Sequence, residues 1–104
     1  MTVTVSEKER RLTVRLVGEI DHHSARDVMR RIESAMERSV PRDCVLDLDG
    51  VTFMDSSGIA VILKAYRRMN ESGGRLWVEN VRPQAMKVLD AAGIERLVKI
   101  SACP

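Results

Sequence analysis

A chain of 104 residues, with 44% apolar and 31% charged side chains, has room for one hydrophobic core and is too apolar to be disordered. Its 17 basic and 15 acidic residues are interspersed and give a formal charge of only +2, which argues against a nucleic-acid-binding surface. The longest apolar run is short, so we expect neither a signal peptide nor a membrane span. The sequence therefore predicts a single domain over residues 1–104, located in the cytoplasm.

Neither the cysteines nor the histidines show the spacing of a metal site. Cys44 and Cys103 lie far apart, without a Cys-x-x-Cys or Cys/His pattern, so we expect two reduced thiols, with Cys44 in the core. His22 and His23 are adjacent, and their side chains diverge too far to hold one ion. The sequence therefore predicts no metal and no cofactor.

The N-terminal part of the chain predicts two strands and a helix. Polar and apolar residues alternate in Thr2–Val5 and in Leu12–Leu16, as they do in half-buried strands, and the charged stretch between them predicts a hairpin turn. Gly18 is expected to end the second strand. Ser24 is placed as the N-cap of a helix, and apolar residues every three or four positions then predict that this helix ends near Ser39, before a proline.

The rest of the chain alternates strands with helices. Cys44–Leu48 predicts a central strand that Gly50 is expected to end, and a helix follows from about Ser57 to Asn70, apolar all round at its start. Further elements are predicted at Leu76–Val78 (strand), from Pro83 to Gly93 (helix) and at Leu97–Ile100 (strand). The order is β-β-α-β-α-β-α-β, which predicts an α/β fold with a mixed, largely parallel sheet.

One tetrapeptide, Asp55-Ser56-Ser57-Gly58, places polar residues where a strand and loop lead into the most apolar helix. Loops at the carboxyl ends of the strands carry function in open α/β sheets. A serine there is presented to solvent beside unpaired helix N–H groups, which favour an anion such as a phosphate. Gly58 lets another backbone approach closely.

Enzyme chemistry finds little support in the sequence. There is no phosphate-binding loop, no Gly-x-Gly-x-x-Gly and no Gly-x-Ser-x-Gly nucleophile elbow. A nucleophilic Ser56 would need a histidine or lysine spaced to activate it, and none is convincing. A receiver domain with Asp47 or Asp49 as phosphoacceptor would need five βα units, more than this length allows.

Two segments carry a resemblance to a known family. Phe53–Leu63 (FMDSSGIAVIL) resembles the signature of anti-sigma-factor antagonists, in the bacterial STAS-domain family. Leu16–Ser24 (LVGEIDHHS) is similar to the second-strand motif of that family, and its Asp-His-His is most similar to the sporulation-type antagonists. The two motifs lie in the expected order on matching elements, and the similarity runs over essentially the whole chain.

The resemblance implies a function. In that family the first serine of the tetrapeptide is the phosphoacceptor, which is Ser56 here. The chain would not be an enzyme; it would bind an anti-sigma factor with serine kinase activity, and the sigma factor would be released. The partner would bring ATP and phosphorylate Ser56, which ends the binding, and a phosphoserine phosphatase would restore it. No direct contact with nucleic acid or membrane is implied. The residues expected to contact the partner are Asp21, His22, Met54, Asp55, Ser57 and Gly58.

Alternatives remain at the level of the protein and of its residues. The protein could be a STAS-type adaptor or scaffold subunit whose serine is not phosphorylated. Asp55 or Ser56 could serve only as the helix N-cap, and Asp21 only as a turn residue. Phe53 and Met54 could be exposed and anchor a partner, but the core is the more common place for apolar residues beside a strand end.

Overall fold

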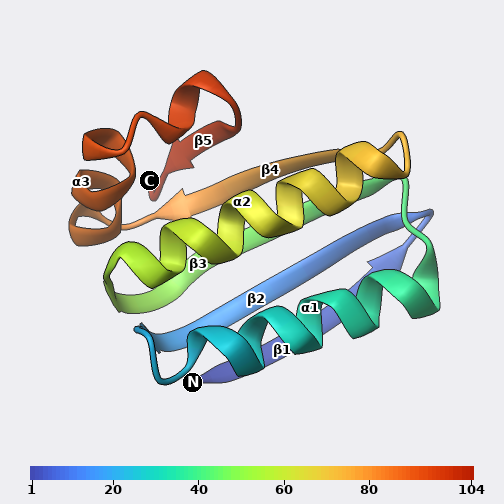
Figure 1. Cartoon of the computed structure of the whole chain (residues 1–104), viewed down its shortest axis with the longest axis horizontal. Coiled ribbons are helices and arrows are strands. Elements are labelled where there is room, and N and C mark those ends of the chain that lie inside the picture. The colour runs from blue at the N-terminus through green and yellow to red at the C-terminus, as the bar shows by residue number, and fades with distance from the viewer.

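The computed structural model describes all residues, 1–104, and contains one five-stranded sheet. The strands lie side by side in chain order, β1 pairs antiparallel with β2, and every later pair is parallel (Figure 1). Their bounds are Thr2–Lys8 (β1), Arg11–Ile20 (β2), Asp43–Met54 (β3), Arg75–Val81 (β4) and Lys99–Ala102 (β5). The predicted mixed, largely parallel sheet is confirmed.

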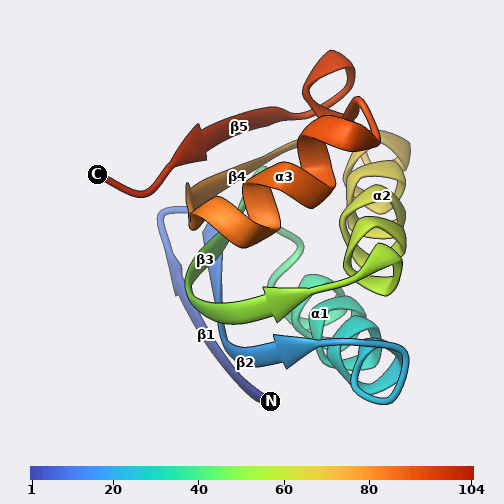
Figure 2. The same cartoon turned by 90° about the vertical axis from the view of Figure 1, so that its left-hand side faces the viewer.

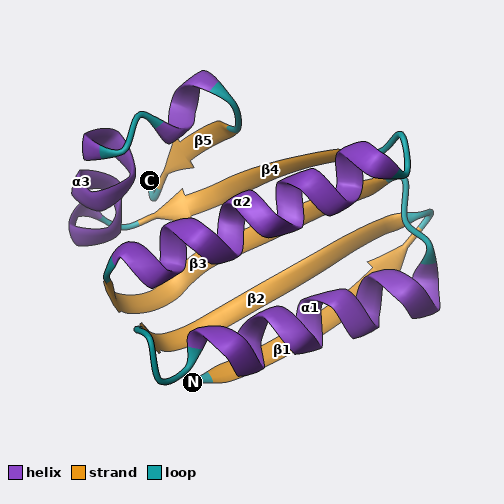
Figure 3. Cartoon of the chain, viewed as in Figure 1, coloured by secondary structure: helices purple, strands orange, loops and turns teal.

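Three α-helices connect the parallel strands: α1 (Ala25–Ser39), α2 (Ser56–Glu71) and α3 (Pro83–Ala91). Helices α1 and α2 run side by side over one face of the sheet, as the purple and orange layers of Figure 3 show. Helix α3 packs at one end, against β3 (Figure 2). The element order β-β-α-β-α-β-α-β is confirmed. No helix combines the length and the hydropathy needed to cross a membrane.

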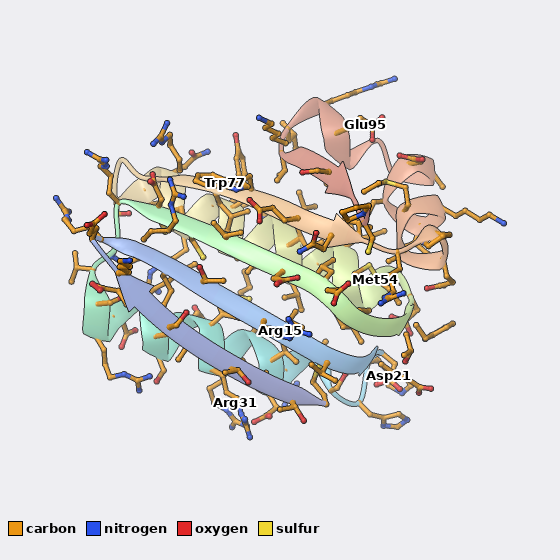
Figure 4. The ribbon with its side chains drawn as sticks, turned by 180° about the vertical axis from the view of Figure 1, so that it is seen from behind. Arg15, Asp21, Arg31, Met54, Trp77 and Glu95 are labelled. Atoms are coloured by element: carbon orange, nitrogen blue, oxygen red, sulfur yellow. The ribbon has the colours of Figure 1, made fainter.

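The core lies between the helical layer and the sheet. In β2 every second residue, Leu12, Val14 and Leu16, is buried on the helix side, as the alternation predicts. From α1 the buried residues are Val28, Met29, Ile32, Ala35 and Met36. Each fully buried Leu, Ile or Val side chain contributes about 1.5–3 kcal/mol to stability. The opposite face of the sheet has no helical cover, and polar side chains such as Arg15 project from it (Figure 4).

The two glycines that were expected to end strands do not end them. Gly18 lies inside β2, which continues to Ile20 with Gly18 at φ +118°, and Gly50 lies inside β3. A Cβ at residue 50 would lie 2.7 Å from Cγ2 of Val17, so the close approach of the two strands requires glycine there. Irregular register beside both glycines lets the pair continue. The result is a longer β2–β3 pair than predicted, reaching Ile20 and Met54.

The predicted last strand is displaced towards the C-terminus. Instead of Leu97–Ile100, β5 covers Lys99–Ala102 and follows a short 3₁₀ helix, Ile94–Arg96. Leu97 is 59% exposed, whereas Val98 is buried and donates its N–H to the carbonyl oxygen of Ile94 at 3.0 Å. This apolar run is therefore divided between a turn and a strand.

Candidate functional site

Strands β2 and β3 end side by side at the same end of the sheet, which we call the sheet edge, and the motif residues follow there. Ile20 is the register partner of Met54, and the N–H of Asp55 donates to the carbonyl oxygen of Ile20 at 3.2 Å. Asp21 and Asp55 therefore follow directly from paired residues on adjacent strands. Figure 4 shows Asp21 and Met54 at this same end of the sheet.

Asp55 is the N-cap of α2. Its backbone is extended (φ −112°, ψ −167°), and its Oδ1 accepts the N–H of Ser57 at 2.8 Å. Its carbonyl oxygen accepts the N–H of Gly58 at 3.0 Å. Because Asp55 supplies the cap, the capping alternative applies to Asp55 and not to Ser56. Ser56 is the first residue of α2, and it is exposed at the positive end of the helix dipole.

Two of the expected partner-contact residues are buried. Met54 is 1% exposed, and Gly58 packs over it, since a Cβ on Gly58 would lie 2.4 Å from Cγ of Met54. The side chain of Met54 thus contributes to the core, as one of the two alternatives for it predicts. Met54 therefore has no exposed side chain at this sheet edge, and Gly58 is covered as well.

Phe53, by contrast, is 41% exposed, so its expected place in the core is wrong. The cause is the irregular register late in β3. Val51 pairs with Gly18 and Phe53 with Glu19, so Thr52 is left out of the pairing, and two consecutive side chains point outward. The exposed ring lies three positions before Ser56, at the functional edge.

Asp21 organises the loop that leads into α1. Its Oδ1 accepts N–H groups from His23 and Ser24, both at 3.0 Å. These bonds, that from Ser24 first, hold the pKa of the Asp21 carboxyl below its ordinary value, so it is ionised at neutral pH. Ser24 occupies the N-cap position as predicted, but its hydroxyl does not cap the helix; it donates to the carbonyl oxygen of Glu19 at 2.9 Å. Asp21 is thus a turn residue, whose carboxylate stays at the sheet edge.

A groove of about 510 Å³ between α1 and α2 adjoins this edge. His22 and Ser57, which the sequence places far apart, both line it. Its apolar lining comes from Ala25, Met29, Ala60 and Val61, and its charged lining from Arg26, Arg30, Lys64 and Glu33. The groove is therefore an apolar depression with an excess of cations. No group of three or more His, Cys, Asp or Glu side chains in the chain is placed to hold a metal ion.

Gln84 is a site residue that sequence reasoning missed. From the first turn of α3, its Oε1 accepts the N–H of Met54 at 2.8 Å and its Nε2 donates to the carbonyl oxygen of Met54 at 2.9 Å. An exposed glutamine after a proline carries no local signal of this contact. Only the tertiary arrangement, in which α3 packs against the end of β3, brings the two residues together.

Comparison with known proteins gives consistent findings. The STAS domain family profile matches residues 2–102. The "Anti-sigma F factor antagonist" of Paenibacillus polymyxa is 39% identical over 89 residues, which cover 86% of this chain and 76% of that protein. The "Anti-sigma F factor antagonist" of Lysinibacillus sphaericus is 31% identical over 83 residues, covering 80% and 71%. The unphosphorylated form of the anti-sigma factor antagonist SpoIIAA superposes with a TM-score of 0.82 at 24% identity, over 97% of this chain and 89% of that one, so it shares the fold.

Proposed function

The chain belongs to the STAS-domain family, and on this basis we propose that it is an anti-sigma-factor antagonist switched by phosphorylation of Ser56. Unphosphorylated protein binds an anti-sigma factor in the cytoplasm and frees the sigma factor. The anti-sigma factor, acting as a serine kinase with its own ATP, phosphorylates Ser56 and is released, and a phosphoserine phosphatase resets the cycle. The chain itself acts as a binding protein and performs no catalysis.

The observation that carries this proposal is the division of roles between Asp55 and Ser56. The carboxylate of Asp55 caps α2, so the stability of the helix does not depend on the Ser56 hydroxyl. That hydroxyl is exposed on the first residue of the helix, where a kinase reaches it and where the helix dipole favours a phosphate. The serine is thus available for modification without disturbing the fold.

The proposed docking surface surrounds Ser56. It consists of Asp21 and the capping residue Asp55, together with His22 and Ser57, which line the groove. The buried residues Met54 and Gly58 pack beneath this surface. A phosphate on Ser56 adds about −1.5 to −2 charges beside the carboxylate of Asp55. A docked partner that offers no cation would leave this charge unpaired and desolvated, at a cost of about 3–5 kcal/mol. Each 1.4 kcal/mol is about tenfold in affinity, so phosphorylation releases the partner.

The test is titration calorimetry of the anti-sigma factor with Ser56→Ala and Ser56→Asp, with circular dichroism as a check of folding. Ser56→Ala should bind like the wild type, because the surface stays uncharged at residue 56. Ser56→Asp should fold but bind at least about tenfold more weakly, because its carboxylate places a charge beside Asp55. The loss should be smaller than the loss caused by a phosphate, which carries more charge. Ser34→Asp, an exposed serine on α1, is the matched control for added charge and should leave binding unchanged.

A folded Ser56→Asp variant that binds as tightly as Ser34→Asp would show that charge at residue 56 is not the switch. That result would instead favour an adaptor that binds its partner without serine phosphorylation.

A further inference from the structure

Strand β3 extends beyond its neighbour β4. The β3–β4 register ends where Asp47 pairs with Glu79, whereas on its other side β3 stays paired with β2 as far as Met54. The last part of β3 therefore has no strand on one side. Backbone N–H and C=O groups left unpaired in a packed region destabilise a fold, so they require other partners.

Three side chains from the end of β4 and the start of α3 contact β3 at and beyond its last pair with β4. Asn80 Nδ2 donates to Oδ1 of Asp47 at 3.1 Å. Arg82 donates through Nε to the carbonyl oxygen of Asp49 and through NH2 to its Oδ1 at 3.3 Å. Gln84 makes the last contact, at Met54. The three residues are spaced two positions apart and contact successive points along β3. Arg82 and Gln84 bind backbone groups beyond the last pair with β4, where a paired strand would otherwise bind them.

The Gln84 contact differs from the other two because it satisfies both backbone groups of one residue. The N–H and the carbonyl oxygen of Met54 are bonded at 2.8 and 2.9 Å, as a neighbouring peptide would bond them. A primary amide supplies one acceptor and one donor in the same plane, which matches this task. Met54 comes directly before Asp55 and Ser56, and on the β2 side Asp55 is held by Ile20. The chain is thus fixed from both sides at the point where it turns into α2.

We propose that Gln84 is a positioning residue that holds the end of β3 and thereby fixes how the Ser56 hydroxyl is presented to the kinase. The inference rests on the proposed function for its effect on phosphorylation, and on the backbone hydrogen bonds alone for its effect on the strand end. Without the side-chain amide of Gln84, the backbone of Met54 loses both hydrogen bonds, and the start of α2 is held less firmly. Misplacement of a reacting group by about 1 Å can lower a rate by about a hundredfold. A Ser56 that is held less firmly should therefore be phosphorylated more slowly.

Two variants and one control test this inference. Gln84→Met keeps the length of the side chain and removes both hydrogen bonds. Gln84→Glu keeps an acceptor for the N–H of Met54 but places a second carboxylate oxygen against the Met54 carbonyl oxygen. Protonation of that carboxyl restores a donor, so this variant should recover as the pH falls. Lys87→Met, on the exposed side of the same helix, is the matched control.

The first readout is amide hydrogen exchange followed by NMR, with the wild type beside each variant. In Gln84→Met the amides of Met54 to Ser57 should exchange at least about tenfold faster, while the β2–β3 amides near Asp43 keep their protection. In Gln84→Glu the Met54 amide should regain protection, relative to the wild type, as the pH is lowered. A Met54 amide as well protected in Gln84→Met as in Lys87→Met would overturn the inference, whatever the phosphorylation result.

The second readout is kcat/KM for phosphorylation by the anti-sigma factor kinase. Gln84→Met should lose at least about tenfold and Lys87→Met should match the wild type. If the wild type is phosphorylated and Gln84→Met has the same kcat/KM, the positioning role is overturned. If the wild type itself is not phosphorylated, the proposed function fails, and hydrogen exchange alone then decides whether Gln84 holds the strand end.

Discussion

At the scale of single residues, Asp55 and Ser56 are neighbours with separable roles. Asp55 is committed to the backbone through its hydrogen bond to Ser57, whereas Ser56 is exposed beside it. Gly58 has no side chain and so leaves space for Met54, which packs against the start of α2. Asp55 caps the same helix start. The tetrapeptide thus combines two structural residues with one exposed hydroxyl.

Replacement of Asp55 separates its capping role from its charge. Asp55→Ala removes the acceptor for the N–H of Ser57 and should lower the free energy of unfolding by about 1 kcal/mol. Asp55→Asn keeps an acceptor and should cost far less, because Asn caps a helix about as well as Asp. Urea denaturation measures both. Equal stability of the two variants would show that the cap contributes nothing.

Substitution of Gly58 tests the packing beneath the site. In Gly58→Ala the new methyl group meets Met54, whose Cγ would be 2.4 Å away, so we expect a loss of about 1–3 kcal/mol in unfolding free energy. Met54→Ala alone leaves a cavity and should cost about 2–5 kcal/mol. The double variant should lose less than the sum, because the added methyl enters the space that Met54 leaves. Strictly additive losses would contradict this contact.

At the scale of elements, the sequence predicts the helices better than the strand ends. The spacing of apolar residues in α1 and the capping residue of α2 are local signals, and both helices begin and end within a residue or so of the prediction. The glycines at 18 and 50 were interpreted as strand ends because their role depends on the neighbouring strand. The exposure of Phe53 and the contact of Gln84 have the same non-local origin, since pairing register and helix docking decide them.

Asp43 joins three strands at the opposite end of the sheet from Ser56. It is buried at the start of β3, and its carboxylate bonds Arg75 of β4 at 3.0 Å and Arg11 of β2 at 3.4 Å. The hydrogen bond from Arg75, aided by Arg11, holds its pKa below the ordinary value. A carboxyl whose pKa is lower in the folded than in the unfolded state stabilises the fold above the unfolded value and loses that contribution as the pH falls.

Asp43→Asn should therefore be less stable than the wild type at neutral pH. The difference should shrink as the pH falls below about 4, the ordinary pKa of an aspartate, and through the lower folded-state pKa. Thermal unfolding from pH 7 to pH 2 measures it, with Asp90→Asn, an exposed carboxylate on α3, as the control. A difference that stays constant over this range would mean that the ionised Asp43 contributes nothing to stability.

At the scale of the whole molecule, the two faces of the sheet differ. One is covered by α1 and α2 and encloses the core; the other is uncovered and carries charged and aromatic side chains, including Trp77 (Figure 4). On that face Trp77 lies beneath the guanidinium groups of Arg11 and Arg75, at 5.0 and 5.9 Å from the ring centroid. The site occupies neither face but the edge between them, where Ser56 is exposed outside the core.

The two cysteines differ in burial. Cys44 is buried in the core, and burial raises the pKa of its thiol to about 12. Cys103 is half-buried near the C-terminus, where the carboxylate of Asp49 raises its thiol pKa. A thiol reagent at pH 8 should label Cys103 in the native protein and Cys44 only when the core opens. Peptide mapping with Cys103→Ser as the control measures this, and rapid native labelling of Cys44 would contradict the packing described.

We propose that Ser56 is the phosphorylated residue and that its phosphate ends the complex. The most direct measurement is phosphopeptide mapping of bound and free protein, separated by size after incubation with the anti-sigma factor kinase and ATP. We expect phosphate on Ser56, confined to the free fraction, and unmodified Ser56 in the complex. Phosphate on Ser57 with Ser56 unmodified, or Ser56 phosphate in the bound fraction, would contradict it.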